Sequence, residues 1–236
     1  MSVHANIEPL GWESAFFALS SAKLVWDELA APVQAADLQP YALVQAKVPA
    51  ARLDLADGLA HLGFQLAEGE VDLALSLPAP LPVHALPSGW RCRVATEADI
   101  ALLRSAAAQT FAHSRFRAPW YQPSDSGRFY AEWIEKAVRG TFDHQCLLIE
   151  QDEQILGFVT LRDLGQQQAR IGLLAAMPAC AGRGVGQQLM WAAQNWCQTQ
   201  GISTLRVATQ TGNVAALRLY IRSGAVITDT AYWFYR

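Results

Sequence analysis

The stretch Pro178-Ala179-Cys180-Ala181-Gly182-Arg183-Gly184-Val185-Gly186-Gln187-Gln188-Leu189 decides the fold of this chain. A strand-like apolar run precedes it, and its glycines turn the chain into a helix predicted over 184–200, which Gly201 ends. Unpaired amides and the positive end of the helix dipole meet at such a turn, and glycines let an anion approach the backbone. The turn therefore predicts a phosphate or diphosphate site, with a plain helix start as the alternative.

A second informative segment is Asn213-Val214-Ala215-Ala216-Leu217-Arg218-Leu219-Tyr220, on the next predicted helix. Ala216 and Tyr220 are four residues apart and share one helix face, where the small alanine leaves room for a ligand. A phenol with a pKa of about 10 is a suitable acid for a departing thiolate. Tyr220 is therefore a candidate proton donor, with a half-buried core tyrosine as the alternative, and Asn213 has the position of a helix cap.

The composition excludes several classes of protein. Of the 236 residues 52% are hydrophobic and 17% charged, so the chain can bury a sizeable core. The net charge is -3 and the sequence shows no basic stripe, which argues against a nucleic-acid-binding protein. Its four cysteines are widely spaced, which indicates free thiols and argues against a zinc site, so no metal is expected. Neither a signal peptide nor a membrane-spanning stretch is evident, and the expected location is the cytoplasm.

A proline-rich segment at 77–89 divides the chain into a smaller N-terminal part, 1–76, and a C-terminal domain, 90–236. Proline disfavours helix before it, so this segment is predicted to be an extended linker. The C-terminal domain alternates strands with helices, which indicates an α/β fold on one mixed sheet. The predicted strands are 91–96, 145–151, 155–164, 168–177, 204–210 and 226–235, and the predicted helices are 97–111, 127–138, 184–200 and 214–223.

The N-terminal part ends in a predicted helix, 53–62, then Gly63, then a strand, 65–75. The chain itself ends in the same order around Gly224. We interpret this as a partial second copy of one unit, with chance recurrence in α/β proteins as the alternative. The aromatic end Tyr232-Trp233-Phe234-Tyr235 is predicted to cover a sheet edge or to pair with a second chain.

The glycine turn, Asn213-x-x-Ala216-x-x-x-Tyr220 and Gly224 together resemble the Gcn5-related N-acetyltransferases (GNAT), in that family's order of elements, from about Trp90 to the end. The resemblance implies a mixed central sheet flanked by helices, with the N-terminal part as a partial unit of the same kind. It also implies that acetyl-CoA is the cosubstrate, that Asn213 contacts its arm and that Tyr220 protonates its thiolate. The residues implied to hold its pyrophosphate are Cys180, Ala181, Gly182, Arg183, Gly184, Val185 and Gly186.

One position departs from the family pattern. Ala181 stands where the family has glutamine or arginine, which removes a side chain but no backbone amide. We expect Arg183 to compensate for the missing contact.

Segments outside the glycine turn indicate the acceptor. The runs 12–17, 68–72, 114–121 and 231–236 resemble acetyltransferases that act on dTDP-linked 4-amino sugars. This resemblance spans the whole chain, implies a dTDP-linked amino sugar as acceptor and favours a homodimer. Four residues of one run, Arg115, Arg117, Trp120 and Tyr121, are suited to bind a diphosphate and to stack on a ring. Arginines that extend from a core-packing segment are the alternative.

Direct transfer to an amine calls for a base and for a group that holds the oxyanion. Glu68 is the first candidate for the base, with a solvated turn carboxylate as the alternative, and His113 and His144 are the others. A backbone amide within 173–175 is expected to hold the oxyanion.

Three other interpretations stay open. Cys180 lies near a helix N-terminus and could form a covalent intermediate, although no histidine neighbours it in the sequence. The acceptor could be a different amine, such as another amino sugar, a protein N-terminus or an antibiotic. The chain could also be a non-catalytic acetyl-CoA sensor, against which Asn213 and Tyr220 argue.

Overall fold

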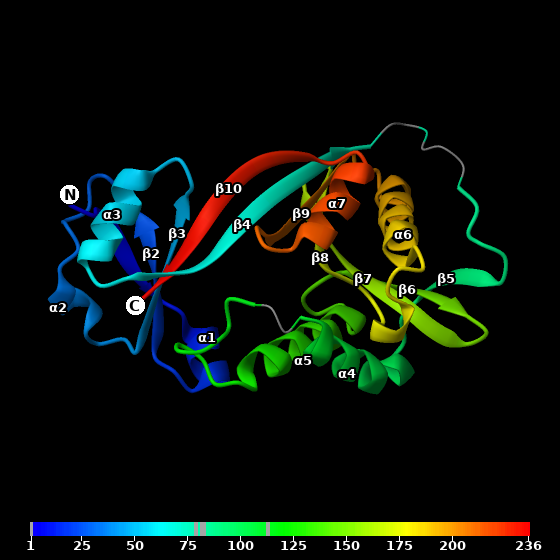
Figure 1. Ribbon diagram of the computed structural model, residues 1–236, viewed down its shortest axis with the longest axis horizontal. Coiled ribbons are helices and arrows are strands. Elements are labelled where there is room, and N and C mark those ends of the chain that lie inside the picture. Colours follow the sequence, from blue (N-terminus) through cyan, green and yellow to red (C-terminus); the bar gives the residue numbers. More distant parts are fainter. Residues whose placement is uncertain (1, 78–79, 81–83, 112–113) are drawn as a thin grey trace.

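The computed structural model describes residues 2–77, 80, 84–111 and 114–236. Helices and strands alternate along these residues, and the strands join in a ten-stranded sheet (Figure 1). In chain order the elements are β1 (Ala5–Pro9), α1 (Gly11–Phe17), β2 (Ser21–Trp26), α2 (Ala35–Leu38), β3 (Leu43–Pro49), α3 (Leu53–His61), β4 (Gln65–Ser76), β5 (Trp90–Val94), α4 (Ile100–Thr110), α5 (Asp125–Val138), β6 (Gln145–Gln151), β7 (Gln154–Gly165), β8 (Gln168–Ala176), α6 (Val185–Thr199), β9 (Thr204–Gln210), α7 (Val214–Arg222) and β10 (Val226–Tyr235).

The sheet is mixed, in the order β1-β2-β3-β10-β4-β9-β8-β7-β6-β5. The pairs β2–β3 and β8–β9 are parallel, and their connections contain α2 and α6, whereas the other neighbours are antiparallel. This confirms the predicted α/β fold with a mixed sheet. Each predicted strand and helix is present within three residues of its expected ends, and the helix expected from Glu97 begins there as a 3-10 turn.

Two long strands, β4 and β10, join the two halves of the molecule (Figure 1). They pair with each other along most of their length; β10 also pairs with β3 through 231–235, and β4 pairs with β9 through 70–76. The prediction that Tyr232–Tyr235 covers a sheet edge is wrong, because β10 lies inside the sheet between β3 and β4. The proposed domain boundaries fall at the end of β4 and the start of β5, and linker residues 78–79 and 81–83 lie outside the described residues.

The two halves repeat one arrangement. The unit β3-α3-β4 matches β9-α7-β10, and Gly63 (φ 85°) and Gly224 (φ 93°) follow the two helices in the left-handed conformation. The parallel pair β2–β3 is held over 21–23 and 43–45, and the strands then separate. In this N-terminal half the indole of Trp26 donates to the carbonyl of Lys47 (2.7 Å), so a side chain bridges the two separated strands.

Helices cover both faces of the C-terminal sheet (Figure 1). Helices α6 and α7 pack on one face, with Ile171 and Leu189 in their core, whereas α4 and α5 pack on the other, with Leu148 and Leu173. Strand β8 contributes to both cores because Gly172 and Leu173 together oppose the single residue Thr160 of β7. This bulge reverses the side-chain alternation of β8 halfway along the strand.

Helix α6 approaches β7 closely at Gly157. A Cβ there would lie 2.7 Å from the carbonyl oxygen of Ala175 and 2.7 Å from Cγ1 of Val185. We expect Gly157→Ala to lower the free energy of unfolding by about 1–3 kcal/mol, because the helix must move away. Urea denaturation measures the change, with Gly11→Ala as the control, since a Cβ at Gly11 meets nothing within 4 Å. Equal midpoints for the two variants would contradict the close approach.

Candidate active site

An opening lies between β8 and β9. The two strands pair only over 168–171 and 204–207. Beyond these residues β8 stays paired with β7 as far as Ala176, and β9 stays paired with β4 as far as Gln210. The two strands therefore separate where the bulge of β8 begins, and their facing edges lose their backbone partners there.

A cavity of about 300 Å³ lies at this opening between β8 and β9. It is lined by 170–174 of β8, by 207–210 of β9, and by Asn213, Ala216 and Tyr220 at and on α7. The other lining residues are Glu68, Glu70, Phe111, Arg115, Phe116, Phe129, Tyr130, Trp133, Phe142, Asp143, Arg162 and Trp233. Four residues singled out in the sequence, Glu68, Arg115, Asn213 and Tyr220, thus share one cavity.

Tyr220 and Asn213 come from the two ends of α7. Tyr220 is 5% exposed, and burial raises the pKa of its phenol, because a buried phenolate is poorly solvated. The phenol therefore keeps its proton near neutral pH, as a proton donor must. The side chain of Asn213 accepts from the amide of Ala216 (3.2 Å), so it caps α7 and also lines the cavity.

Glu68 lies on β4, the neighbour of β9 in the sheet, and its half-buried side chain lines the cavity. Burial raises the pKa of its carboxyl to about 7; the charge of Arg115 opposes this shift and that of Glu70 adds to it. A carboxylate that exchanges its proton near neutral pH suits a general base. Of the other candidates, His144 accepts from the amide of Asp163 (3.0 Å) and is not a lining residue, and His113 lies outside the described residues.

Arg115 ties the cavity to the N-terminal half. Its guanidinium donates to Oε1 of Gln45 (2.9 Å) and to the hydroxyl of Tyr235, and it lies 4.0 Å from the ring centroid of Trp233. Gln45 donates in turn to Glu13 on α1. Burial and these partners hold Arg115 in one orientation, with little freedom to turn toward a ligand.

The other three residues that the sequence suggested for acceptor binding do not line the cavity. Arg117 is exposed and donates to the carbonyl of Ala67 (3.0 Å), and Trp120 packs edge-on against Tyr235 at 5.2 Å between centroids. Tyr121 is buried in the same aromatic cluster. Packing at the junction of the two halves accounts for the positions of all three side chains.

The sequence reasoning missed a buried carboxylate in the wall of the cavity. Asp143 is fully buried and accepts from Nε1 of Trp133 (2.7 Å), the hydroxyl of Thr160 (2.6 Å) and Nε of Arg162 (2.9 Å). The Thr160 hydroxyl accepts from the amide of Leu173 (2.8 Å). Asp143 thus orients two cavity side chains and, through Thr160, fixes the bulge of β8.

The hydrogen bonds of Asp143 and Thr160 limit which backbone amide within 173–175 can donate to the oxyanion. The amide of Leu173 is already bonded to Thr160 and points toward β7. Hydrogen-bonding groups alternate sides along a strand, so the next amide, that of Leu174, points toward the opening between β8 and β9. Leu174 lines the cavity, and its amide is the best placed of the three in 173–175.

The glycine turn lies at the start of α6. Gly182 (φ 77°) and Gly184 (φ 82°) have left-handed backbones, and a Cβ at either would meet nothing within 4 Å. The turn 181–184 is exposed, and the amides of Val185 and Gly186 have no acceptor within their helix. The site is therefore a row of accessible amides at a helix N-terminus, which suits a diphosphate.

The cysteines are free thiols, as predicted. Cys180 is 1% exposed, with its sulfur 3.8 Å from Nη1 of Arg183, and it does not line the cavity. A thiol this buried cannot reach a substrate carbonyl in the cavity, which argues against the covalent route.

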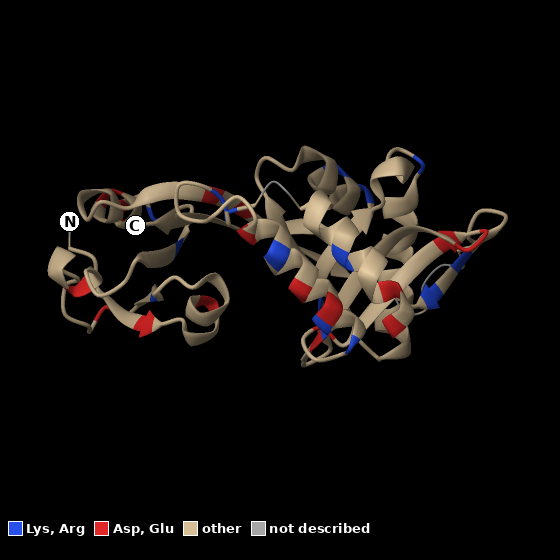
Figure 2. Ribbon diagram, turned by 90° about the horizontal axis from the view of Figure 1, so that it is seen from below, with Lys and Arg blue, Asp and Glu red and all other residues tan. Residues whose placement is uncertain are grey.

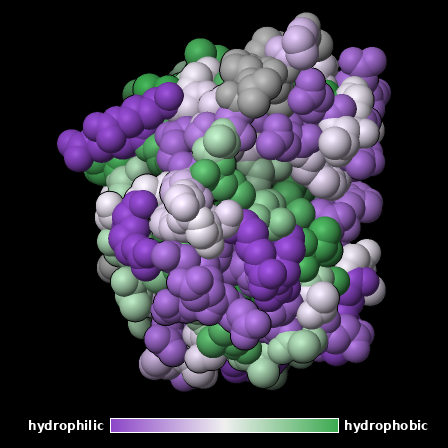
Figure 3. All heavy atoms as spheres, turned by 90° about the vertical axis from the view of Figure 1, so that its right-hand side faces the viewer, coloured by the Kyte–Doolittle hydropathy of each residue, from purple (hydrophilic) through white to green (hydrophobic). Residues whose placement is uncertain are grey.

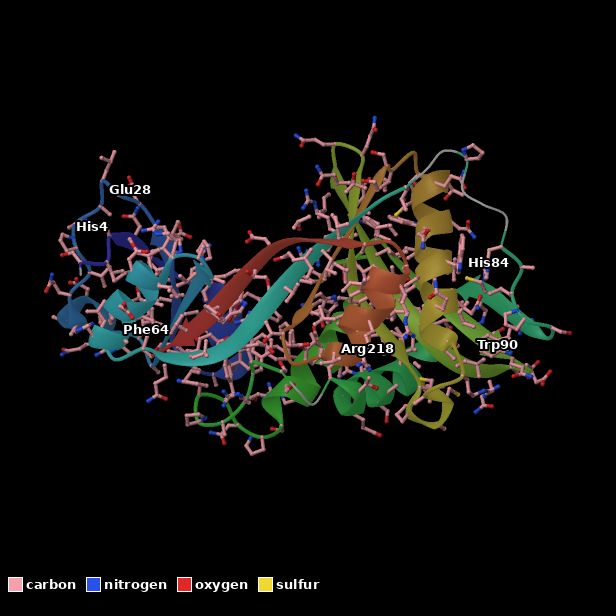
Figure 4. All side chains as sticks on the ribbon, turned by 45° about the horizontal axis from the view of Figure 1, so that its top comes forward. His4, Glu28, Phe64, His84, Trp90 and Arg218 are labelled. Atoms are coloured by element: carbon pink, nitrogen blue, oxygen red, sulfur yellow. The ribbon has the colours of Figure 1, made fainter. Side chains whose placement is uncertain are left out.

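A second cavity of about 240 Å³ lies between β5 and α6. It belongs to the end of the molecule that Figure 3 shows, where hydrophobic residues lie among mostly hydrophilic ones. His84 lies beside α6 (Figure 4), stacks on Trp191 at 4.4 Å and hydrogen-bonds Gln188 (2.6 Å). The second cavity shares no lining residue with the first, and none of the site residues singled out in the sequence lines it.

Charges of both signs are interspersed along the ribbon (Figure 2). Among the described residues no group of three or more His, Cys, Asp or Glu side chains is placed to hold a metal ion. In the same part of the chain, no helix has the length and apolar character needed to cross a membrane.

Comparison with known proteins defines the family. A sequence profile of the acetyltransferase (GNAT) family matches residues 108–225. The chain belongs to this family and is an acetyltransferase. The dTDP-fucosamine acetyltransferase of Escherichia coli is 53% identical over 238 residues, covering all of both chains. Mycothiol acetyltransferase of Mycobacteroides abscessus is 28% identical over 192 residues, 79% of this chain and 52% of that protein.

Solved structures agree on the fold. A GCN5-related N-acetyltransferase from Sphaerobacter thermophilus has a TM-score of 0.62 at 16% identity; the match covers 82% of this chain and 59% of that one. A tandem GNAT protein from the clavulanic acid biosynthesis pathway has a TM-score of 0.62 at 13% identity, over 92% of this chain and 74% of that one.

Proposed function

We propose that this protein transfers the acetyl group of acetyl-CoA to the 4-amino group of dTDP-4-amino-4,6-dideoxy-D-galactose, giving dTDP-4-acetamido-4,6-dideoxy-D-galactose. The observation that carries the proposal is the cavity at the β8–β9 opening, which both Glu68 and Tyr220 line. The full-length likeness to the E. coli enzyme supports the acceptor. We further propose that the product enters the synthesis of enterobacterial common antigen.

The donor fits the opening and the glycine turn together. The amides of Val185 and Gly186, which have no acceptor within α6, lie behind the exposed turn 181–184 and suit the diphosphate of coenzyme A, and Arg183 adds a positive charge beside them. Arg183 is held by Gln151 (2.9 Å), so its charge stays at the turn despite the alanine at 181. The unpaired edges of β8 and β9 offer backbone groups to the amide-rich arm, and Asn213 stands at the end of that opening.

The chemistry is a direct transfer. Glu68 takes a proton from the sugar ammonium, and the free amine attacks the thioester carbonyl to form the C–N bond. The amide of Leu174 donates to the oxyanion of the tetrahedral intermediate. As the C–S bond breaks, Tyr220 gives its proton to the thiolate, and the nitrogen of the intermediate releases its extra proton to solvent to become the amide. Solvent then returns a proton to the phenolate and takes the one that Glu68 holds. The amide product and free coenzyme A leave.

One assay tests the function. The protein is incubated with acetyl-CoA and the dTDP-linked amino sugar, and free thiol is measured with a chromogenic reagent. Thiol release that depends on the sugar is expected. Release only with another amine, such as a peptide N-terminus or an aminoglycoside, would contradict the acceptor. Binding of acetyl-CoA without release for any amine would favour the sensor.

A further inference from the structure

Three arginines stand directly opposite one another on adjacent strands. Arg162 of β7 pairs with Arg170 of β8, and Arg170 pairs with Arg206 of β9. Residues that pair across a sheet project from the same face. This arginine row lies on the face that α4 and α5 cover, because the neighbouring residues Leu161, Ile171 and Val207 point into the core under α6.

Like charges directly opposite each other destabilise a sheet, and the surrounding groups balance this row only in part. Arg162 is paired with the buried Asp143 (2.8 Å). Arg170 has one longer contact, 3.3 Å to Asp72, and that carboxylate also faces Lys47 at 3.4 Å. Arg206 donates to the neutral side chain of Gln168 (2.7 Å).

The carboxylate of Glu70, which lies near Asp72, does not neutralise the arginine row because it already has partners. Glu70 is engaged by Lys47 (2.6 Å) and by the indole of Trp233 (2.9 Å). Arg206 has no carboxylate partner among the described residues, and Arg170 shares Asp72 with Lys47. The arginine row itself is therefore incompletely neutralised, even with Glu68 and Glu70 in the lining of the same cavity, and an anion with two or more charges would compensate it.

We propose that the arginine row binds the diphosphate of the acceptor, a nucleoside diphosphate sugar. This inference rests on the proposed function and assigns a substrate site within the same cavity. Arg162 and Arg170 line the cavity, and Arg206 extends the row beyond them. Guanidinium groups bind phosphate oxygens through paired hydrogen bonds, so neighbouring arginines on a rigid sheet suit two linked phosphates.

The position along β8 agrees with the chemistry of the sugar. Arg170 precedes Leu174 by four residues, about 13 Å of strand. A hexose with the amine on C4 carries its diphosphate on C1, across the ring from the amine. The ring and the reach of the arginine side chain fill that distance, which leaves the amine at the opening. Arg115 is less suited to this role, since Gln45, Tyr235 and Trp233 already engage it.

Binding of dTDP alone, measured by calorimetry, tests the site without any acetyl transfer. We expect Arg170→Met to weaken dTDP binding about 10-fold or more, since it removes charge-assisted hydrogen bonds. Arg206→Met is expected to weaken it by a smaller factor. Arg139→Met is the matched control, because this exposed arginine bonds Glu97 and Glu135 on the surface. Its dTDP affinity should equal that of the wild type.

Kinetics add a second measurement. Arg170→Met should raise KM for the dTDP-linked sugar about 10-fold or more, with kcat changed much less, because the diphosphate lies away from the reacting atoms. Unchanged dTDP affinity in folded Arg170→Met and Arg206→Met would overturn the site; if Arg170→Met fails to fold, Arg206→Met decides. Lost dTDP binding in the variants, with no turnover by the wild type, would refute the proposed function and leave the diphosphate site standing.

Discussion

Tyr220→Phe is expected to lower kcat for acetyl transfer by about 10²–10³-fold, since a positioned general acid contributes an acceleration of this order. The change removes one hydroxyl and keeps the ring that packs in the core under α6 and α7. The affinity for acetyl-CoA should therefore stay within about twofold of the wild type. Steady-state kinetics with the dTDP-linked sugar, together with calorimetric titration of acetyl-CoA, measure both quantities.

A matched control separates this role from that of a core tyrosine. Tyr41 packs against the N-terminal core and does not line the cavity. Tyr41→Phe should leave kcat unchanged. If Tyr220→Phe keeps the wild-type kcat, or loses acetyl-CoA affinity in step with kcat, Tyr220 is not the proton donor.

Local patterns in the sequence were enough to predict most of the C-terminal elements. Strands such as 204–210 and helices such as 214–223 follow from hydrophobic periodicity and from glycines at their ends, which are local properties. The pairing of strands is not local. The edge position predicted for Tyr232–Tyr235 was wrong because β10 enters the sheet beside β3, a strand nearly two hundred residues earlier in the chain.

The same difference between local patterns and strand pairing explains which residues of the candidate site could be predicted. Glu68 was singled out from the sequence by its chemistry and Tyr220 by the family motif, and both line one cavity in the structure. Asp143 and the arginine row were not found. Their positions depend on the register of β7, β8 and β9 and on the bulge at Gly172, none of which leaves a periodic signal.

The aromatic segment 114–121 shows a further limit. A segment of arginines and aromatic residues has the same composition whether its side chains bind a ligand or pack in a core. In the structure Arg115 reaches the cavity wall, whereas Arg117, Trp120 and Tyr121 pack around it. The path of the loop decides between the two roles, and that path is set by contacts with β4, β10 and α1.

Glu68→Gln is expected to lower kcat/KM by about 10²-fold at pH 8, because glutamine cannot accept the proton of the sugar ammonium. The pH dependence carries the sharper signature. Burial raises the pKa of the Glu68 carboxyl to about 7, so the active carboxylate forms only as the pH rises through this value. Because protonation of Glu68 removes the base, it should by itself lower the wild-type kcat/KM about 10-fold for each pH unit below about 6.

The amine of the sugar also loses its proton as the pH rises, and this affects every variant equally. The ratio of wild-type to Glu68→Gln kcat/KM cancels that contribution. It should rise with pH to a plateau, with a midpoint of about 7. Glu135→Gln is the control carboxylate: hydrogen bonds from Arg139 and Arg104 hold the pKa of Glu135 below its ordinary value, and Glu135 does not line the cavity. The ratio of wild type to Glu135→Gln should therefore be flat between pH 6 and 8, and a flat ratio for Glu68→Gln would exclude Glu68 as the base.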